Sequence, residues 1–261
     1  MFITILGSAA KQDANRECVS VLAESGSQRI LFDVGPGIVA SLCRAHRKAS
    51  EVNNVILTHV HGDHILGFAY FVFTRNGEIK ALKDVNDHDY TLNVYGRQDT
   101  ISLAQIMLNG AYPGMKLCFK INYVAIDEIN HIAVDSSITL DFVPAIHAVP
   151  TISSIIHAEG KKVVYSSDTL PNENLQQLAQ GADFLIHEGM YTHDNYDNSR
   201  RAKHSTSLDA GEFAASIHPK HLVLVHIAAK MFGDEKKMLS EVFSNYKGVT
   251  SIPYDGSVYV V

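Results

Sequence analysis

The segment from Thr58 to His64 constrains this chain more than any other part of its sequence. It reads THVHGDH and places three histidines and one aspartate within six residues, directly after the apolar run Val55–Leu57. Imidazole nitrogens and carboxylate oxygens this close together can converge on a divalent metal ion without help from distant parts of the fold. A single histidine is usually structural, but four such side chains at a strand end predict a metal site.

Three further potential ligands lie far along the chain, each as the first strongly ligating side chain after an apolar, strand-like run: His147, Asp168 and His226. Considered singly, each has an ordinary explanation as a core histidine or a turn aspartate. Strand ends that open onto one edge of a rigid scaffold bring such side chains together. We therefore expect these residues to join the first cluster and to complete two metal sites.

Composition sets modest bounds on this interpretation. The chain has 261 residues, 46% of them hydrophobic, which is enough for one large α/β domain or two small ones. The net charge of −6 excludes a global basic field that would attract nucleic acid, so such a contact would need a local patch. No segment approaches the roughly 18–20 apolar residues of a membrane span, and we expect no membrane partner.

Cysteine usage indicates the compartment. Cys18, Cys43 and Cys118 are scattered, odd in number and contain no CxxC pair. This pattern favours a reducing environment and argues against a disulfide framework. The apolar segment Met1–Ala10 lacks the basic start of a secretion signal and is better interpreted as a first strand. We therefore expect a cytoplasmic protein.

Strand-like and helix-like patterns alternate along the chain. We expect strands at Phe2–Leu6, Cys18–Leu22, Arg29–Asp33, Val55–Leu57, Leu92–Tyr95, Ile138–Val143, Ser153–His157, Val163–Ser166, Phe184–Ile186 and His221–Val225, with two more within Val249–Val261. We expect helices at Ile38–Ala45, Thr100–Leu108, Asn174–Ala179 and Leu208–Ile217. Because helices separate many of the strands, the pattern predicts sheets with flanking helices rather than an all-β domain.

The order of these motifs resembles that of the metallo-β-lactamase superfamily. An HxHxDH motif at residues 59–64 is followed by His147, Asp168 and His226, and the resemblance extends to the Phe32–Gly35 turn and to Tyr165–Thr169. It covers nearly the whole chain. It implies an α/β protein (α+β in some schemes), namely a four-layer αββα sandwich, formed by one hydrolase domain over residues 1–261. A dinuclear metal site would lie at one edge of the sandwich.

The resemblance also implies a role for each ligand by position. It implies that His59, His61 and His147 bind one metal ion. It implies that Asp63, His64 and His226 bind the other ion, and that Asp168 bridges the two. Asp33 would lie behind them and orient a ligand histidine. Two metal ions about 3.5–4 Å apart would activate a bridging water near neutral pH, which Asp63 would orient. Zn²⁺ suits this donor set best, although Mn²⁺ or iron could occupy it.

Two further motifs resemble the ribonuclease Z branch of the superfamily. They are Leu185–Glu188 and Lys203–Thr206. The resemblance implies that Glu188 holds His204 and that protonated His204 donates to the leaving oxygen. A phosphodiester needs such a donor, because an alkoxide leaves poorly. Without the resemblance, Glu188 could be a surface carboxylate and His204 a loop histidine.

The sequence departs from the tRNA-processing members of this branch. Those enzymes carry a long glycine- and proline-rich arm, in many of them between the third and fourth metal motifs, whereas His147 and Asp168 here lie only 21 positions apart. Arg200, Arg201 and Lys203 form only a small basic group near His204. We therefore expect a small-molecule or short, terminal phosphodiester as the substrate and doubt tRNA. A homodimer is compatible with the resemblance.

Several functions remain open alongside the favoured phosphodiesterase. The chain could hydrolyse lactones, thioesters or other carboxylic esters, in which case His204 would be incidental. It could also be a tRNA 3′-processing endonuclease or a catalytically silent binding protein. Within segment 74–120, the cluster of Asp84, Asp87, His88 and Asp89 is interpreted as an exposed acidic loop rather than as another metal site.

Overall fold

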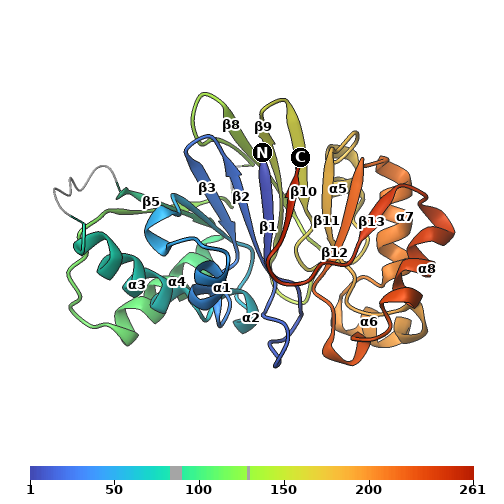
Figure 1. Cartoon of the computed structure of the whole chain (residues 1–261), viewed down its shortest axis with the longest axis horizontal. Coiled ribbons are helices and arrows are strands. Elements are labelled where there is room, and N and C mark those ends of the chain that lie inside the picture. Colours follow the sequence, from blue (N-terminus) through green and yellow to red (C-terminus); the bar gives the residue numbers. More distant parts are fainter. Residues whose placement is uncertain (83–89, 128–129) are drawn as a thin grey trace.

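The computed structural model describes residues 1–82, 90–127 and 130–261. In these ranges two seven-stranded sheets pack face to face, with helices on both outer faces (Figure 1). The first sheet consists of β14 (Ser257–Val260), β1 (Phe2–Gly7), β2 (Ser20–Ser25), β3 (Gln28–Phe32), β4 (Asn54–Leu57), β5 (Leu92–Gly96) and β6 (Ile121–Ala125), in this spatial order. The second consists of β13 (Val249–Ser251), β12 (His221–Val225), β11 (Phe184–Glu188), β10 (Lys161–Tyr165), β9 (Ile152–Ala158), β8 (Ile138–Pro144) and β7 (His131–Ala133).

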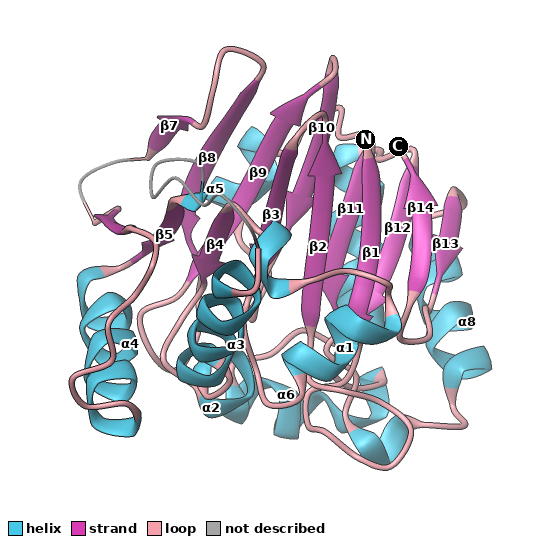
Figure 2. Ribbon diagram, turned by 60° about the vertical axis from the view of Figure 1, so that its left-hand side comes forward, coloured by secondary structure: helices cyan, strands magenta, loops and turns pink. Residues whose placement is uncertain are grey.

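The helices form the two outer layers. Those of the N-terminal half are α1 (Ile38–Arg44), the short α2 (Gly62–Ile65), α3 (Phe68–Lys80) and α4 (Gln98–Ala111). Those of the C-terminal half are α5 (Glu173–Leu178), α6 (Tyr196–Ala202), α7 (Ser207–Ile217) and α8 (Glu235–Asn245). Figure 2 shows α1 and α3 in front of the first sheet. Layers in the order helix, sheet, sheet and helix confirm the predicted αββα sandwich.

The strands alternate between two kinds of apolar environment, as the period of two in a β-strand requires. On β1, Ile3 and Ile5 face the second sheet, whereas Leu6 packs with the residues beneath α1 and α3. A third cluster fills the space between the second sheet and helices α5, α7 and α8. The core therefore consists of one layer between the sheets and one under each helical layer, which fixes the sheets relative to each other.

Strand direction places several strand ends at one edge. Strands β3 to β6 are mutually parallel, and so are β10 to β13. Because β9 is antiparallel to both β8 and β10, β8 also runs in the direction of β10. The carboxyl ends of β8, β10, β11 and β12 therefore lie at the same edge of the second sheet.

Segment 74–120 contains the end of one helix and the predicted strand and helix that follow it. Helix α3 continues to Lys80, and β5 and α4 occupy much of the remainder. Asp84, Asp87, His88 and Asp89 lie outside the described residues. Helix α3 was not among the expected helices, and it buries Phe71, Val72 and Ile79 against the first sheet.

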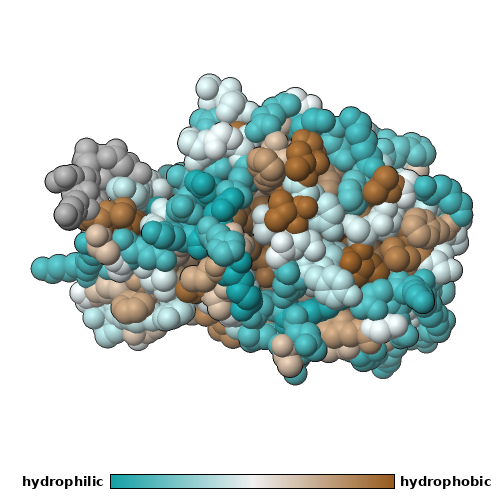
Figure 3. All heavy atoms as spheres, in the orientation of Figure 1, coloured by the Kyte–Doolittle hydropathy of each residue, from teal (hydrophilic) through white to brown (hydrophobic). Residues whose placement is uncertain are grey.

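No helix in the described ranges is long and apolar enough to cross a bilayer. On the described part of the face in Figure 3, apolar residues form separate small patches among polar ones. Phe2, Val258 and Val260, on neighbouring strands β1 and β14, are among the exposed apolar side chains.

Helices α7 and α8 approach each other closely at Gly211. A Cβ atom added there would lie 2.8 Å from the Cα and carbonyl oxygen atoms of Val242. We expect Gly211→Ala to lower the free energy of unfolding by about 1–3 kcal/mol, since backbone must move. Gly77→Ala on α3, where nothing lies within 4 Å, should instead raise it by about 0.4–1 kcal/mol. Urea unfolding measures both, and equal stabilities would contradict the close contact.

Candidate metal centre

The predicted ligands lie at strand ends on one edge of the sandwich. His59 and His61 follow β4, and α2, at the lower edge in Figure 1, carries Asp63 and His64. From the second sheet, the remaining ligands follow three strands: His147 follows β8, Asp168 follows β10 and His226 follows β12. The structure brings these residues into groups whose potential ligand atoms lie within 4.8 Å of one another.

The backbone turns sharply at this edge. Asp33, Ser167 and His226 follow β3, β10 and β12 with φ angles of 60°, 53° and 56°, and Lys203, directly before His204, has a φ of 56°. These are four of the seven non-glycine residues with positive φ in the described part of the chain. Such conformations cost energy and persist where surrounding contacts fix them, which is common at functional sites.

Three histidine nitrogens form the first group. His61 Nδ1 lies 3.1 Å from His59 Nε2 and 3.2 Å from His147 Nε2. Asp168 Oδ2 lies 3.6 Å from His59 Nε2 and 3.8 Å from His147 Nε2. Four potential donor atoms thus surround one point between β4, β8 and β10.

Hydrogen bonds on the far side of two rings set their tautomers. Thr58 Oγ1 donates to the Asp33 carboxylate (3.0 Å), so it accepts a proton from His59 Nδ1 (2.9 Å). His147 Nδ1 donates to the Lys203 carbonyl (3.0 Å). The Nε2 atoms of both rings therefore present lone pairs to His61. Burial lowers the pKa of His59 well below its usual value and that of His147 to about 4, which keeps these rings neutral and able to bind a cation.

The second group combines two histidines with two carboxylates. His64 Nε2 and His226 Nε2 each lie 3.4 Å from Asp63 Oδ2 and 3.3 Å from Asp168 Oδ2. Burial raises the pKa of Asp63, but the hydrogen bond to His226 and the nearby His64 ring outweigh this effect and lower the pKa below the usual range. Asp63 is therefore ionised. Asp168 Oδ2 faces histidines of both groups and lies between them.

The donor chemistry of both groups fits a divalent cation. Among the described residues, buried His64 Nε2 and Asp168 Oδ1 have no hydrogen-bond partner. Leaving such atoms unsatisfied in the interior costs about 1–3 kcal/mol each. Neutral imidazoles and carboxylates that converge in this way are a donor set for divalent transition metals. These groups support the use of a divalent metal.

Asp33 lies directly behind the second group. Its buried carboxylate accepts hydrogen bonds from His64 Nδ1 (2.8 Å), the Thr58 amide (2.9 Å) and the Tyr165 hydroxyl (3.2 Å). The bond to His64 leaves the Nε2 atom of that ring facing Asp63 and Asp168. Together with Thr58 Oγ1, the carboxylate connects one histidine of each group. Thr58 and Tyr165 were not singled out from the sequence, although Thr58 directly precedes the histidine motif.

Glu188 and His204 form a pair beside the two groups. His204 Nδ1 lies 3.0 Å from Glu188 Oε2, and the Thr169 amide donates to Glu188 Oε1. The His204 ring lies 4.8 Å from the ring of His147 and 5.1 Å from that of His226, between centroids. Burial lowers the pKa of His204, but the Glu188 carboxylate outweighs it and raises the pKa to about 9. The Nδ1 proton points to Glu188, which leaves Nε2 for another partner.

The loop that carries His204 is fixed by the cap of helix α7 and by contacts with the segments that carry the candidate ligands. Thr206 caps α7 through a capping box with Asp209. Ser205 Oγ donates to the Thr169 carbonyl (2.6 Å), directly after Asp168. The basic group named above is largely engaged within the protein, because Arg200 pairs with Asp209 (2.6 Å) and Lys203 Nζ donates to the His147 carbonyl (3.2 Å).

Fold and donor set together define a metal-dependent hydrolase with the metallo-β-lactamase fold. The family model described as beta-lactamase superfamily domain matches residues 28–227, and the chain belongs to this superfamily. Within it, the chain is of the ribonuclease Z-like type. Ribonuclease Z of Natronomonas pharaonis is 28% identical to it over 97% of this chain and 96% of its own length.

Two solved structures have a similar fold over the whole chain. The metallo-β-lactamase fold protein YhfI from Bacillus subtilis has a TM-score of 0.83 at 24% identity, over 99% of this chain and 98% of that one. The short form of human tRNase Z has a TM-score of 0.81 at 20% identity, over 100% of this chain and 99% of that one. The predicted superfamily, ribonuclease Z-like branch and hydrolase class are confirmed.

Proposed function

We propose that the protein is a dinuclear metallophosphodiesterase that acts on a small or terminal phosphodiester. The observation that carries this proposal is the buried Glu188–His204 pair beside the two donor groups. The two groups would hold one zinc ion each, with Asp168 shared between them, in the arrangement His59, His61 and His147 for one ion and Asp63, His64 and His226 for the other. When bound, the ions supply an activated hydroxide and neutralise charge on the phosphoryl oxygens.

The protein's own groups complete the reaction. Asp63 Oδ2 accepts a hydrogen bond from the attacking water and orients it. Glu188 holds the His204 ring through Nδ1, so that Nε2 donates its proton to the oxygen of the leaving alcohol. Asp33 keeps His64 turned toward the reaction site. A thiolate leaves without a proton donor, so this pair favours a phosphodiester over a thioester.

The length of the chain supports a substrate smaller than tRNA. The alignment with the Natronomonas pharaonis ribonuclease Z extends over 303 positions, whereas this chain has 261 residues. Dozens of residues of that ribonuclease Z therefore have no counterpart in this chain. Most of the interval between His147 and Asp168 is taken up by strands β9 and β10, which leaves no space for an arm. Three free cysteines support the expected cytoplasmic location.

Metal content and a substrate panel test this proposal together. Untreated protein should contain two zinc ions per chain by inductively coupled plasma mass spectrometry. The same preparation should hydrolyse bis(p-nitrophenyl) phosphate faster than a lactone or a thioester. Protein that carries metal, leaves the phosphodiester intact and rapidly opens lactones or thioesters would overturn the phosphodiesterase assignment. Iron in place of zinc would overturn the assignment of the metal alone.

A further inference from the structure

The Tyr165 hydroxyl links the two sheets at the metal centre. Tyr165 is the last residue of β10 in the second sheet, and its hydroxyl donates to Asp33 Oδ2 (3.2 Å), directly after β3 in the first sheet. The other hydrogen bonds to the Asp33 carboxylate come from Thr58 and His64, which both follow β4 of the first sheet. Within the described ranges, Tyr165 is therefore the sole contribution of the second sheet to this carboxylate.

Two neighbouring residues hold the Tyr165 side chain in place. The rings of Phe32 and Tyr165 meet edge to face with their centroids 5.2 Å apart, and Asp33 accepts the hydroxyl proton. Burial and the Asp33 carboxylate raise the pKa of Tyr165 well above its usual value, so the hydroxyl stays protonated and able to donate. The ring is thus packed in one orientation, and that orientation directs the hydroxyl at Asp33.

Asp33 extends this contact to one histidine of each donor group. Its carboxylate accepts a hydrogen bond from His64 Nδ1 in the second group. Thr58 Oγ1 also donates to it and accepts from His59 Nδ1 in the first group. No lysine or arginine among the described residues pairs with this fully buried carboxylate, so it depends on its hydrogen bonds. Without one of its donors the carboxylate is freer to turn, and the two rings are held less firmly.

The strand that carries Tyr165 leads directly to the carboxylate between the two groups. Asp168 lies three positions after Tyr165, and the two residues between them are buried. Asp168 Oδ2 lies 3.6 Å from His59 Nε2 and 3.3 Å from His64 Nε2. A shift of β10 relative to the first sheet would therefore change the distances between Asp168 and these histidines.

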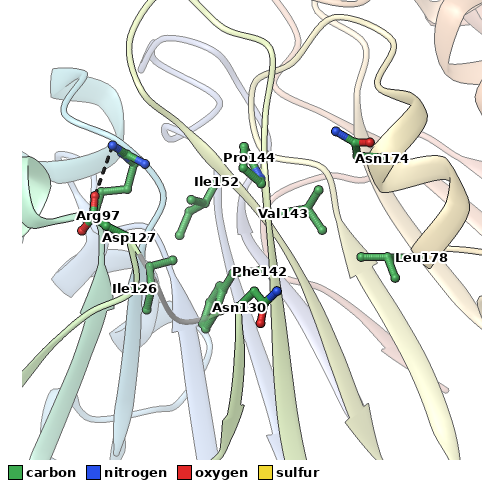
Figure 4. A pocket seen from close by; sticks show the side chains of 10 residues that line it. All are labelled: Arg97, Ile126, Asp127, Asn130, Phe142, Val143, Pro144, Ile152, Asn174 and Leu178. Atoms are coloured by element: carbon green, nitrogen blue, oxygen red, sulfur yellow. Dashed lines mark ion pairs between the residues drawn. The ribbon is translucent and has the colours of Figure 1, made fainter.

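A backbone contact forms a second link between the sheets in this region. The Ile152 amide, at the start of β9, donates to the Thr58 carbonyl (3.2 Å). Figure 4 shows Ile152 beside Pro144, its partner on β8, in the wall of a pocket at the end of these strands. This second link uses main-chain atoms alone, so Tyr165→Phe leaves it in place and removes the first link by itself.

We propose that Tyr165 is a positioning residue that holds the metal ligands of the first sheet in place relative to those of the second. This inference rests on the metal binding of the proposed function and extends it to a residue that is not itself a ligand. The hydroxyl fixes the Asp33 carboxylate, which fixes one histidine of each group, while the same strand leads to Asp168. Residues that orient metal ligands from behind typically contribute about ten- to hundredfold in metal affinity.

The zinc affinity of Tyr165→Phe tests this role. Metal-free protein is titrated with zinc in competition with a chromophoric chelator, and the absorption bands of the cobalt-loaded protein report the ligand geometry. We expect Tyr165→Phe to bind zinc about tenfold more weakly and to shift the cobalt bands. Tyr95→Phe is the matched control, because it removes another buried hydroxyl between the sheets, which donates to Asn54 Oδ1 (3.3 Å). This control should change neither measurement.

A double variant shows whether the effect passes through Asp33. In an Asp33→Ala background, Tyr165→Phe should change the zinc affinity by less than about twofold, because the carboxylate that it fixes is absent. A second tenfold loss there would overturn the proposal. So would a Tyr165→Phe protein that melts at a lower temperature but keeps the zinc affinity and cobalt bands of the wild type, since Tyr165 would then be structural only. No substrate is involved, so a failure to hydrolyse phosphodiesters would overturn the proposed function alone.

Discussion

His204→Ala is expected to slow the hydrolysis of a phosphodiester with an alkyl leaving group by a factor of about 10²–10⁴. The variant loses the proton that we assign to the leaving oxygen, and an alkoxide leaves poorly without it. p-Nitrophenolate is stable as an anion, so its esters should slow by less than tenfold. Measuring kcat across methyl phosphodiesters with increasingly basic leaving groups tests this difference. The plot of log kcat against leaving-group pKa should become steeper in the variant.

Two further variants show whether the effect belongs to the pair. Glu188→Gln keeps the shape of the side chain but removes the charge that faces His204 Nδ1, and should show the same dependence on the leaving group to a smaller degree. His193→Ala removes an exposed histidine outside the donor groups and should change nothing. A uniform loss in His204→Ala across all leaving groups would point to a disturbed metal site and contradict the acid role.

The metal-ligand candidates were recognisable in the sequence because most of their signal is local. Four of them lie within six residues, and the strand that precedes them is short and apolar. The three distant candidates follow strands, and parallel strands end at the same edge. Their side chains therefore had to meet at one edge once the sheets had formed. Their roles toward metal stay predictions until the ions are measured.

Helix α3 could not be predicted, because its sequence lacks a polar face. Phe68, Phe71 and Val72 are buried, while Tyr70 and Phe73 are exposed. Apolar residues on both sides of a helix remove the 3.6-residue period on which such predictions rest. Tyr112, after α4, stacks on Phe73 with a centroid distance of 4.6 Å. That contact with α4 explains part of the apolar surface of α3, and no local pattern encodes it.

The contacts that support the site depend on tertiary structure, and most of them could not be predicted from the sequence. Tyr165 reaches Asp33 across 132 residues of sequence. Lys203 orients His147 through its backbone carbonyl, a role that any residue type could fill. Ligand residues are specified by their chemistry, whereas these neighbours are specified by position alone.

Removing the metal ions is expected to abolish turnover and to lower the melting temperature by about 10 °C. Without a cation, the Nε2 lone pairs of His59 and His147 both face His61 Nδ1, at 3.1 and 3.2 Å, and that atom can donate at most one proton. Other buried polar atoms lack partners among the described residues. Binding at 1,000 times the dissociation constant stabilises by about 4.1 kcal/mol. In a chain of this size that corresponds to roughly 2–4 °C per kcal/mol. Calorimetric scans before and after dipicolinate treatment, and after zinc is restored, measure the shift.

Asp168 and Asp63 should differ in how many ions they control. Asp168 Oδ2 lies within 3.8 Å of histidine nitrogens in both groups, whereas Asp63 Oδ2 lies 3.4 Å from His64 and His226, which both belong to the second group. We therefore expect Asp168→Ala to retain less than one ion per chain and Asp63→Ala to retain one, as measured by mass spectrometry. Asp141→Ala, on β8 and paired with His131 and His157, should retain two. If Asp168→Ala and Asp63→Ala lose the same number of metal ions, the two ions bind only as a pair. Independent sites would instead let Asp63→Ala keep the ion of the three-histidine group.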